Sequence, residues 1–113
     1  MDIFDNIIDI FVNYDRPVLF VSEINTAKYI CVLIHETDEY EEWLASEITD
    51  QTYDSLISLR IDFYTCFKTS KFGKSQILKI SDSQVKSVQE VLSSEVPDSS
   101  LPFKGLYRSV SLY

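Results

Sequence analysis

The clearest structural signal in the chain is the run Lys28-Tyr29-Ile30-Cys31-Val32-Leu33-Ile34-His35. Apolar residues fill odd and even positions of this run alike, so an extended chain presents apolar side chains on both faces. A strand of that kind lies inside a sheet that is covered, at least in part, on both sides. We therefore expect residues 28–35 to form a central strand.

Shorter strand patterns flank this run. Residues 3–14 suit a short helical turn that leads into a strand, and Asp15-Arg16-Pro17 predicts a turn before a β-branched and aromatic strand at 18–22. Beyond the central run, an acidic turn at 36–39 leads to a strand at 40–48. Strands joined by connections this short predict an antiparallel meander.

Two short helices are expected after these strands. Thr49 or Asp50 can cap a helix over residues 50–59, because each precedes a stretch with one apolar face. Asp62 can cap a second helical turn that ends near Phe67.

The last third of the chain predicts one more strand and one more helix. Residues 76–80 suit a fourth strand, and Asp82 or Ser83 can cap a helix that carries four apolar residues on one face, namely Val85, Val88, Val91 and Leu92. Residues 94–113 form an irregular tail. The whole chain, residues 1–113, is therefore expected to be a single α+β domain with an antiparallel meander of about four strands and two or three helices.

The charge balance narrows the classes of partner. The chain of 113 residues has 10 basic and 18 acidic side chains, a net charge of −8, and residues 1–67 alone hold 14 acidic and 3 basic ones. Such a field repels phosphate, so binding to nucleic acid or to an anionic membrane is not expected. No apolar run reaches the ~18 residues of a membrane helix. Cys31 and Cys66 sit in apolar runs that are typical of reduced, buried thiols, which predicts a cytoplasmic protein.

Residue patterns for catalysis are scarce. With only two glycines, no phosphate-binding loop can form, and the spacings of zinc, metalloprotease and EF-hand sites are missing. His35 is the only histidine, and Cys31 lies about 13 Å from it on the same strand, too far for a nucleophile–base pair. Cys66 could still meet His35 in space. We predict a non-enzymatic protein without cofactor or metal, with a small Cys66/His35 hydrolase as a remote alternative.

Five carboxylates crowd into the eight residues that run from His35 to Glu42. They are Glu36, Asp38, Glu39, Glu41 and Glu42. The run suits a solvated hairpin turn, a surface that steers a basic protein partner, or a site for a hard divalent cation. The solvated turn is the favoured interpretation and the partner surface comes second.

Aromatic residues raise three further alternatives. Trp43 is favoured as a core ring whose N–H finds a partner at the sheet edge, and an interface anchor is the alternative. At residues 67–74, aromatics interleaved with lysines could stack on nucleic-acid bases while the lysines pair with phosphates, but protection of a loop or sheet edge is favoured. The apolar tail, with Phe103 and Tyr107, either folds back on the sheet, as favoured, or docks on a second chain.

Four strings carry a resemblance to a known family. They are Tyr14-Asp15-Arg16-Pro17-Val18-Leu19-Phe20, Tyr40-Glu41-Glu42-Trp43-Leu44, Leu59-Arg60-Ile61-Asp62-Phe63 and Leu101-Pro102-Phe103-Lys104-Gly105. Together they resemble a family of small bacterial proteins of unknown function, over nearly the whole chain from Ile8 to Gly105. The resemblance implies a bacterial, phage or mobile-element source and a cytosolic setting. It transfers no catalytic residue.

The leading hypothesis is a protein-binding module that acts as subunit, regulator or inhibitor of a cognate protein with a basic surface, such as a component of a phage-defence or other conflict system. An acidic mimic of nucleic acid that inhibits a nucleic-acid enzyme is the alternative. A second copy of the chain is another candidate partner. The residues predicted to bind the partner are Glu36, Asp38, Glu39, Tyr40, Glu41, Glu42, Trp43, Phe103 and Tyr107.

Overall fold

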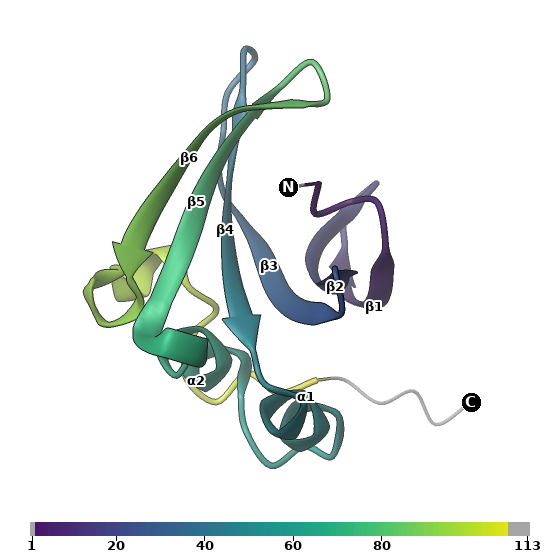
Figure 1. Ribbon diagram of the computed structural model, residues 1–113, viewed down its shortest axis with the longest axis vertical. Helices are drawn as coiled ribbons and strands as arrows, with labels where there is room; N and C mark the ends of the chain where they lie inside the picture. The colour runs from purple at the N-terminus through teal and green to yellow at the C-terminus, as the bar shows by residue number, and fades with distance from the viewer. Residues whose placement is uncertain (1, 109–113) are drawn as a thin grey trace.

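The computed structural model describes residues 2–108, and its framework is a six-stranded antiparallel sheet (Figure 1). The strands are β1 (Ile7–Asn13), β2 (Pro17–Ile24), β3 (Ala27–Glu36), β4 (Glu41–Ile48), β5 (Lys74–Ser81) and β6 (Gln84–Leu92). They lie in the sheet in chain order, so β3, the predicted central strand, pairs with β2 on one side and β4 on the other. The α+β class and the antiparallel meander are confirmed.

Two helices, α1 (Asp50–Ile57) and α2 (Phe63–Lys68), connect β4 to β5. Thr49 caps α1, because its hydroxyl accepts the backbone N–H of Thr52 at 3.0 Å. Asp62 caps α2 in the same way, accepting the N–H of Thr65 at 2.8 Å. Both predicted caps are confirmed. Within residues 2–108, neither helix has the length and apolar character needed to cross a bilayer.

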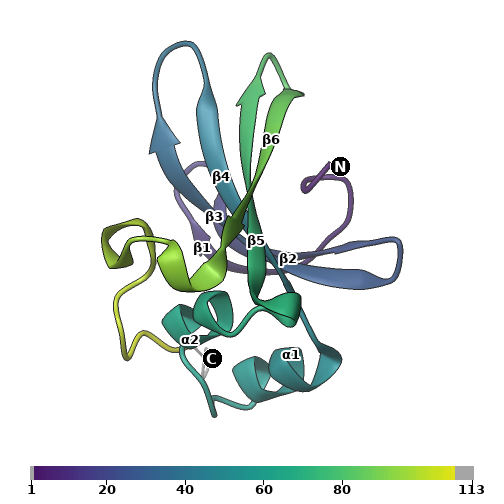
Figure 2. The ribbon, with the colours of Figure 1, turned by 60° about the vertical axis from the view of Figure 1, so that its left-hand side comes forward.

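The sheet carries a core on each face. On one face it packs against α1, α2 and the segment that follows β6, and this core holds Leu19, Val21, Ile30, Leu44, Ile48, Leu56, Phe63, Cys66, Phe67, Val96 and Leu101 (Figure 2). On the other face the sheet curves around the N-terminal turn, whose Ile3 is fully buried (Figure 1). That second core holds Ile3, Phe20, Cys31, Trp43, Ala45, Leu78 and Ile80. Both faces of β3 are therefore covered, as the sequence predicts.

The prediction of about four strands and of a last helix at residues 83–93 is wrong. Asp82 and Ser83 do not cap a helix: both have positive φ, 53° and 61°, and they make the tight turn of a β5–β6 hairpin. A β-bulge adds one residue to β6 between the partners of Lys79 and Ile80, so that Val85 and Val88 share a face despite their helix-like spacing, while Val91 packs on the opposite face. Val85 and Val88, three residues apart, consequently pair with Ile80 and Leu78, which lie on one face of the sheet.

The described part of the tail, up to residue 108, lies against the domain. After β6 the chain forms two short 3₁₀ turns, Ser93–Glu95 and Asp98–Ser100, and buries Val96 and Leu101 in the core. The backbone N–H of Phe63 donates to the carbonyl of Leu106 at 3.0 Å. The predicted tail extends to residue 113, and its last five positions lie outside the described residues.

Candidate functional site

Residues 36–42, which we call the acidic hairpin, comprise the end of β3, the turn at residues 37–40 and the start of β4. Thr37 organises the turn, because its hydroxyl accepts the backbone N–H groups of Glu39 at 3.2 Å and Tyr40 at 3.1 Å. Its own backbone N–H donates to the carbonyl of Tyr40 at 2.8 Å. The hairpin therefore has a defined shape before any partner binds.

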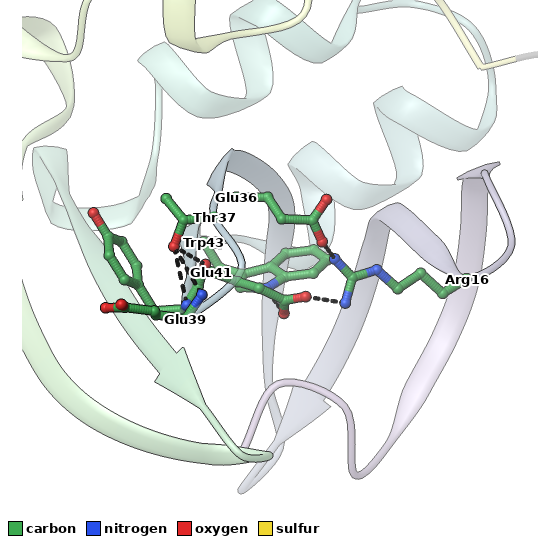
Figure 3. Close-up of polar contacts among 7 residues, drawn as sticks. Arg16, Glu36, Thr37, Glu39, Glu41 and Trp43 are labelled. Carbon is green, nitrogen blue, oxygen red and sulfur yellow. Dashed lines mark hydrogen bonds and ion pairs between the residues drawn. The ribbon is translucent and has the colours of Figure 1, made fainter.

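Arg16 neutralises part of this hairpin. Its guanidinium, on the turn between β1 and β2, forms ion pairs with Glu36 and Glu41 (Figure 3). Glu41 also accepts the indole N–H of Trp43 at 3.1 Å, and the guanidinium carbon lies 6.0 Å from the centre of that ring. Two of the five carboxylates are thus held in a local network that joins the β1–β2 turn to the β3–β4 hairpin.

Of the remaining acidic residues, Asp38 and Glu39 are exposed and Glu42 is half-buried. Within residues 2–108, Asp38, Glu39 and Glu42 form no ion pair, although Glu42 stands opposite Lys79 in the β4–β5 register. The ammonium of Lys79 instead lies 4.0 Å from the centre of the Tyr40 ring, a cation–π contact. The acidic hairpin therefore presents fewer unpaired charges than its five carboxylates alone would suggest.

A hollow of about 510 Å³ opens between the acidic hairpin and its neighbours. Phe4 of the N-terminal turn, Arg16, Tyr40 and Asp82 of the β5–β6 turn are among the residues that line it. In the part of the chain that the structure describes, no three His, Cys, Asp or Glu side chains come together as ligands for a metal ion.

Trp43 lies in the core and does not contact solvent. Its exposed fraction is 0%, and its ring packs against Phe20 and Phe4 at centroid distances of 5.5 and 5.1 Å. The favoured interpretation of a core ring with a satisfied N–H is confirmed. Its inclusion among the residues that bind a partner is wrong, because a side chain without exposed surface cannot form an interface contact.

A second and more apolar depression, which we call the tail groove, separates β1–β3 from the tail. Its volume is about 720 Å³. It is lined by Val12, Tyr14, Val18, Leu19, Val32, Leu33, Ile34, Asp98, Ser99, Ser100, Leu101, Pro102, Phe103 and Leu106. Two aromatic rings stand at this groove with most of their surface exposed, Phe103 at 70% and Tyr14 at 75%.

Polar contacts fix the tail that forms one wall of the groove. Asp98 accepts the hydroxyl of Tyr64 at 2.8 Å, and Lys68 donates to the carbonyl of Val96 at 2.6 Å. The Tyr64 hydrogen bond and the nearby Lys68 ammonium lower the pKa of Asp98. Tyr107, the other predicted tail residue, is 44% exposed and does not line the groove.

The lysines at residues 67–74 face carboxylates. Lys71 lies 3.3 Å from Glu47, and Lys74 lies 3.6 Å from Glu90. Phe72, 79% exposed, stacks with the Lys71 ammonium at 5.2 Å. This arrangement matches the favoured interpretation of loop and edge protection better than a surface for nucleic-acid bases.

The cysteines are inert in this fold. Cys31 and Cys66 are free, fully buried thiols, whereas His35 is exposed near the end of β3. Burial, with a smaller contribution from the Asp62 carboxylate, raises the pKa of Cys66 to about 12, and burial raises that of Cys31 as well. A protonated thiol in the core is not a nucleophile. The geometry gives no support to a Cys66/His35 hydrolase.

Thiol titration tests this conclusion. We expect an aromatic disulfide reagent at neutral pH to modify both thiols at least ~100-fold more slowly in the native protein than in denaturant, because reaction requires an exposed thiolate. The rate is read from the absorbance of the released thiolate. Rapid modification of one thiol in the native protein would contradict the buried placement.

Comparison of the chain with protein-family models, with curated proteins and with solved structures gives no match. The resemblance to a small bacterial family therefore stays a prediction. The two regions of the molecule with features of a binding site are the acidic hairpin and the tail groove.

Proposed function

We propose that the chain is a non-enzymatic protein-binding module that holds an apolar segment of a partner in the tail groove. The observation that carries this proposal is the combination of an apolar groove with two exposed aromatic rings, Phe103 and Tyr14. Exposed aromatics beside a preformed apolar depression are typical of the residues that dominate binding energy at protein interfaces. The groove walls are held by backbone and side-chain contacts, so little ordering is needed on binding.

Charge favours a partner with basic residues beside its apolar segment. The turn between β1 and β2 lies between the tail groove and the acidic hairpin: Tyr14 lines the groove, and Arg16 forms ion pairs with the hairpin. Asp38 and Glu39 at the tip of that hairpin are exposed. Such carboxylates accelerate encounter with a basic surface and add less to affinity than buried apolar contacts do. An acidic mimic of nucleic acid is less well supported, because Arg16 pairs with two of the five carboxylates.

A comparison of matched baits tests the proposal. Tagged wild-type protein, Phe103→Ala and Phe72→Ala are incubated with nuclease-treated bacterial lysate and washed at low and high salt, and retained proteins are quantified by mass spectrometry. Phe72 is the matched control, because it is a highly exposed phenylalanine outside the tail groove. We expect one partner to survive high salt on wild type and on Phe72→Ala, and Phe103→Ala to weaken its affinity by about ten- to a hundredfold.

Charge reversal separates this proposal from mimicry. For docking in the groove, Asp38→Lys with Glu39→Lys slows association but leaves the complex stable at high salt. The mimic would instead be supported by a partner whose binding is lost at high salt and on charge reversal but is unchanged by Phe103→Ala. Equal retention on Phe103→Ala and Phe72→Ala would refute docking in the tail groove.

A further inference from the structure

The outer edge of β6 is a free strand edge. Within residues 2–108, β6 pairs only with β5. Seven of its nine residues are exposed, and Val88 and Leu92 expose 51% and 47% of their surface. Backbone N–H and C=O groups along such an edge are available to a further strand.

The two edges of the sheet differ in how they are protected. β1 pairs with β2 through three irregularities of register, and bulged edges of this kind resist pairing with another chain. β6 has one irregularity, near its start, where Lys86 has no partner on β5. From Ser87 to Leu92 its pairing with β5 is regular. An added strand can therefore continue the sheet beyond β6 more readily than beyond β1.

The sequence of β6 is complementary to itself when it runs antiparallel. In a pair of β6 strands centred on Val88, each Lys86 stands opposite Glu90 of the second copy, because the two residues flank the centre at equal distance. Val88 meets its own counterpart, and Ser87 meets Gln89. Opposite charges and apolar residues are thus matched across the two-fold axis.

We infer that the chain forms a symmetric homodimer in which two β6 strands pair antiparallel about Val88 and extend the sheet across both copies. The charged groups are free to take this role. Among the described residues, the Lys86 ammonium donates to the Gln84 side chain at 3.1 Å and forms no ion pair, and Glu90 makes one exposed contact with Lys74 at 3.6 Å. Exposed contacts of this kind contribute little to stability, so giving them up for Lys86–Glu90 pairs between two copies costs little.

The same two charges also suit a simpler role, which is to keep an unpaired edge solvated. That role predicts no preference for one register and no relation between the two charges. The dimer predicts that they act as a pair, and charge exchange between them separates the two roles.

The test uses the full chain in sedimentation velocity over a concentration series. A pair of edge strands buries less area than a permanent interface, so we expect a dissociation constant of about 10–100 µM. Lys86→Glu and Glu90→Lys should each weaken the dimer about tenfold or more, because each places two like-charge pairs across the axis. The double variant Lys86→Glu/Glu90→Lys should restore it. An equimolar mixture of the two single variants should form a heterodimer.

Two controls make the result specific. Arg60→Glu, an exposed substitution with the same change of net charge as Lys86→Glu, should leave the dimer unchanged. Phe103→Ala should also leave it unchanged, so failure of this inference and failure of the proposed groove are distinguishable. A chain that stays monomeric up to about 1 mM, or a dimer that is indifferent to Lys86→Glu, overturns the inference.

Discussion

Replacing Trp43 with alanine is expected to lower the free energy of unfolding by about 3–5 kcal/mol, the largest effect that we predict for a single residue. The ring is fully buried between β4 and the N-terminal turn, and it contacts Phe20 and Phe4. Its removal leaves a cavity that the curved sheet cannot close. A domain of this size has a total stability of roughly 6–15 kcal/mol, so the variant should remain folded but lose a large share of its stability.

Trp43→Phe is the matched control. It keeps an aromatic ring in the core but removes the five-membered part of the indole together with the N–H that Glu41 accepts, which should cost about 1–2 kcal/mol, less than the alanine variant. Urea unfolding followed by circular dichroism measures both variants, since neither keeps the only tryptophan as a fluorescent probe. If the two variants unfold at the same urea concentration, the packing of this ring is not what holds the N-terminal turn against the sheet.

Local chemistry made β2 to β5 and both helices predictable, whereas the stretch that contains β1 fits a helical turn as well as a strand. The central strand is apolar on both faces, a pattern with few alternatives, and Thr49 and Asp62 are cap residues directly before helical turns. β6 was missed because its turn, Asp82-Ser83, lacks the glycine that marks most tight hairpins. Its bulge lets Val85 and Val88 share a face of the sheet at a spacing of three, which imitates a helix.

The candidate site was predictable only where it is local in the chain. The run of carboxylates at 36–42 is visible in the sequence, but its main counterion, Arg16, is separated from Glu36 by two strands. The tail groove combines β1–β3 with residues 98–106, so no sequence window contains it. The sequence marks Phe103 as part of an apolar tail, whereas Tyr14 stands beside a turn and in a string shared with the resembled family, neither of which indicates a groove.

Asp62→Ala is the second substitution with a large expected effect, about 2–4 kcal/mol of unfolding free energy. Asp62 is 9% exposed, and its carboxylate has two roles: it caps α2 through Thr65, and it accepts the backbone N–H of Gly105 at 2.7 Å. Its loss should therefore loosen the tail as well as the helix. Hydrogen exchange should show faster exchange at residues 96–106 in Asp62→Ala than in Asp62→Asn, which keeps a capping oxygen.

The pH dependence of stability provides an independent test of the same carboxylate. Burial raises the pKa of Asp62, but hydrogen bonds from Thr65 and from the Gly105 N–H lower it more, so the net shift is downward. A lowered pKa in the folded state means that the contribution is complete above the unfolded pKa of ~3.9 and disappears as pH falls through the folded value. Wild type should thus lose stability below about pH 4 more steeply than Asp62→Asn. Asp98→Asn serves as the comparison, because the Tyr64 hydroxyl lowers the pKa of that exposed carboxyl in the same direction. If Asp62→Asn and wild type lose stability in parallel down to acid pH, the carboxylate of Asp62 does not hold the tail in its charged form.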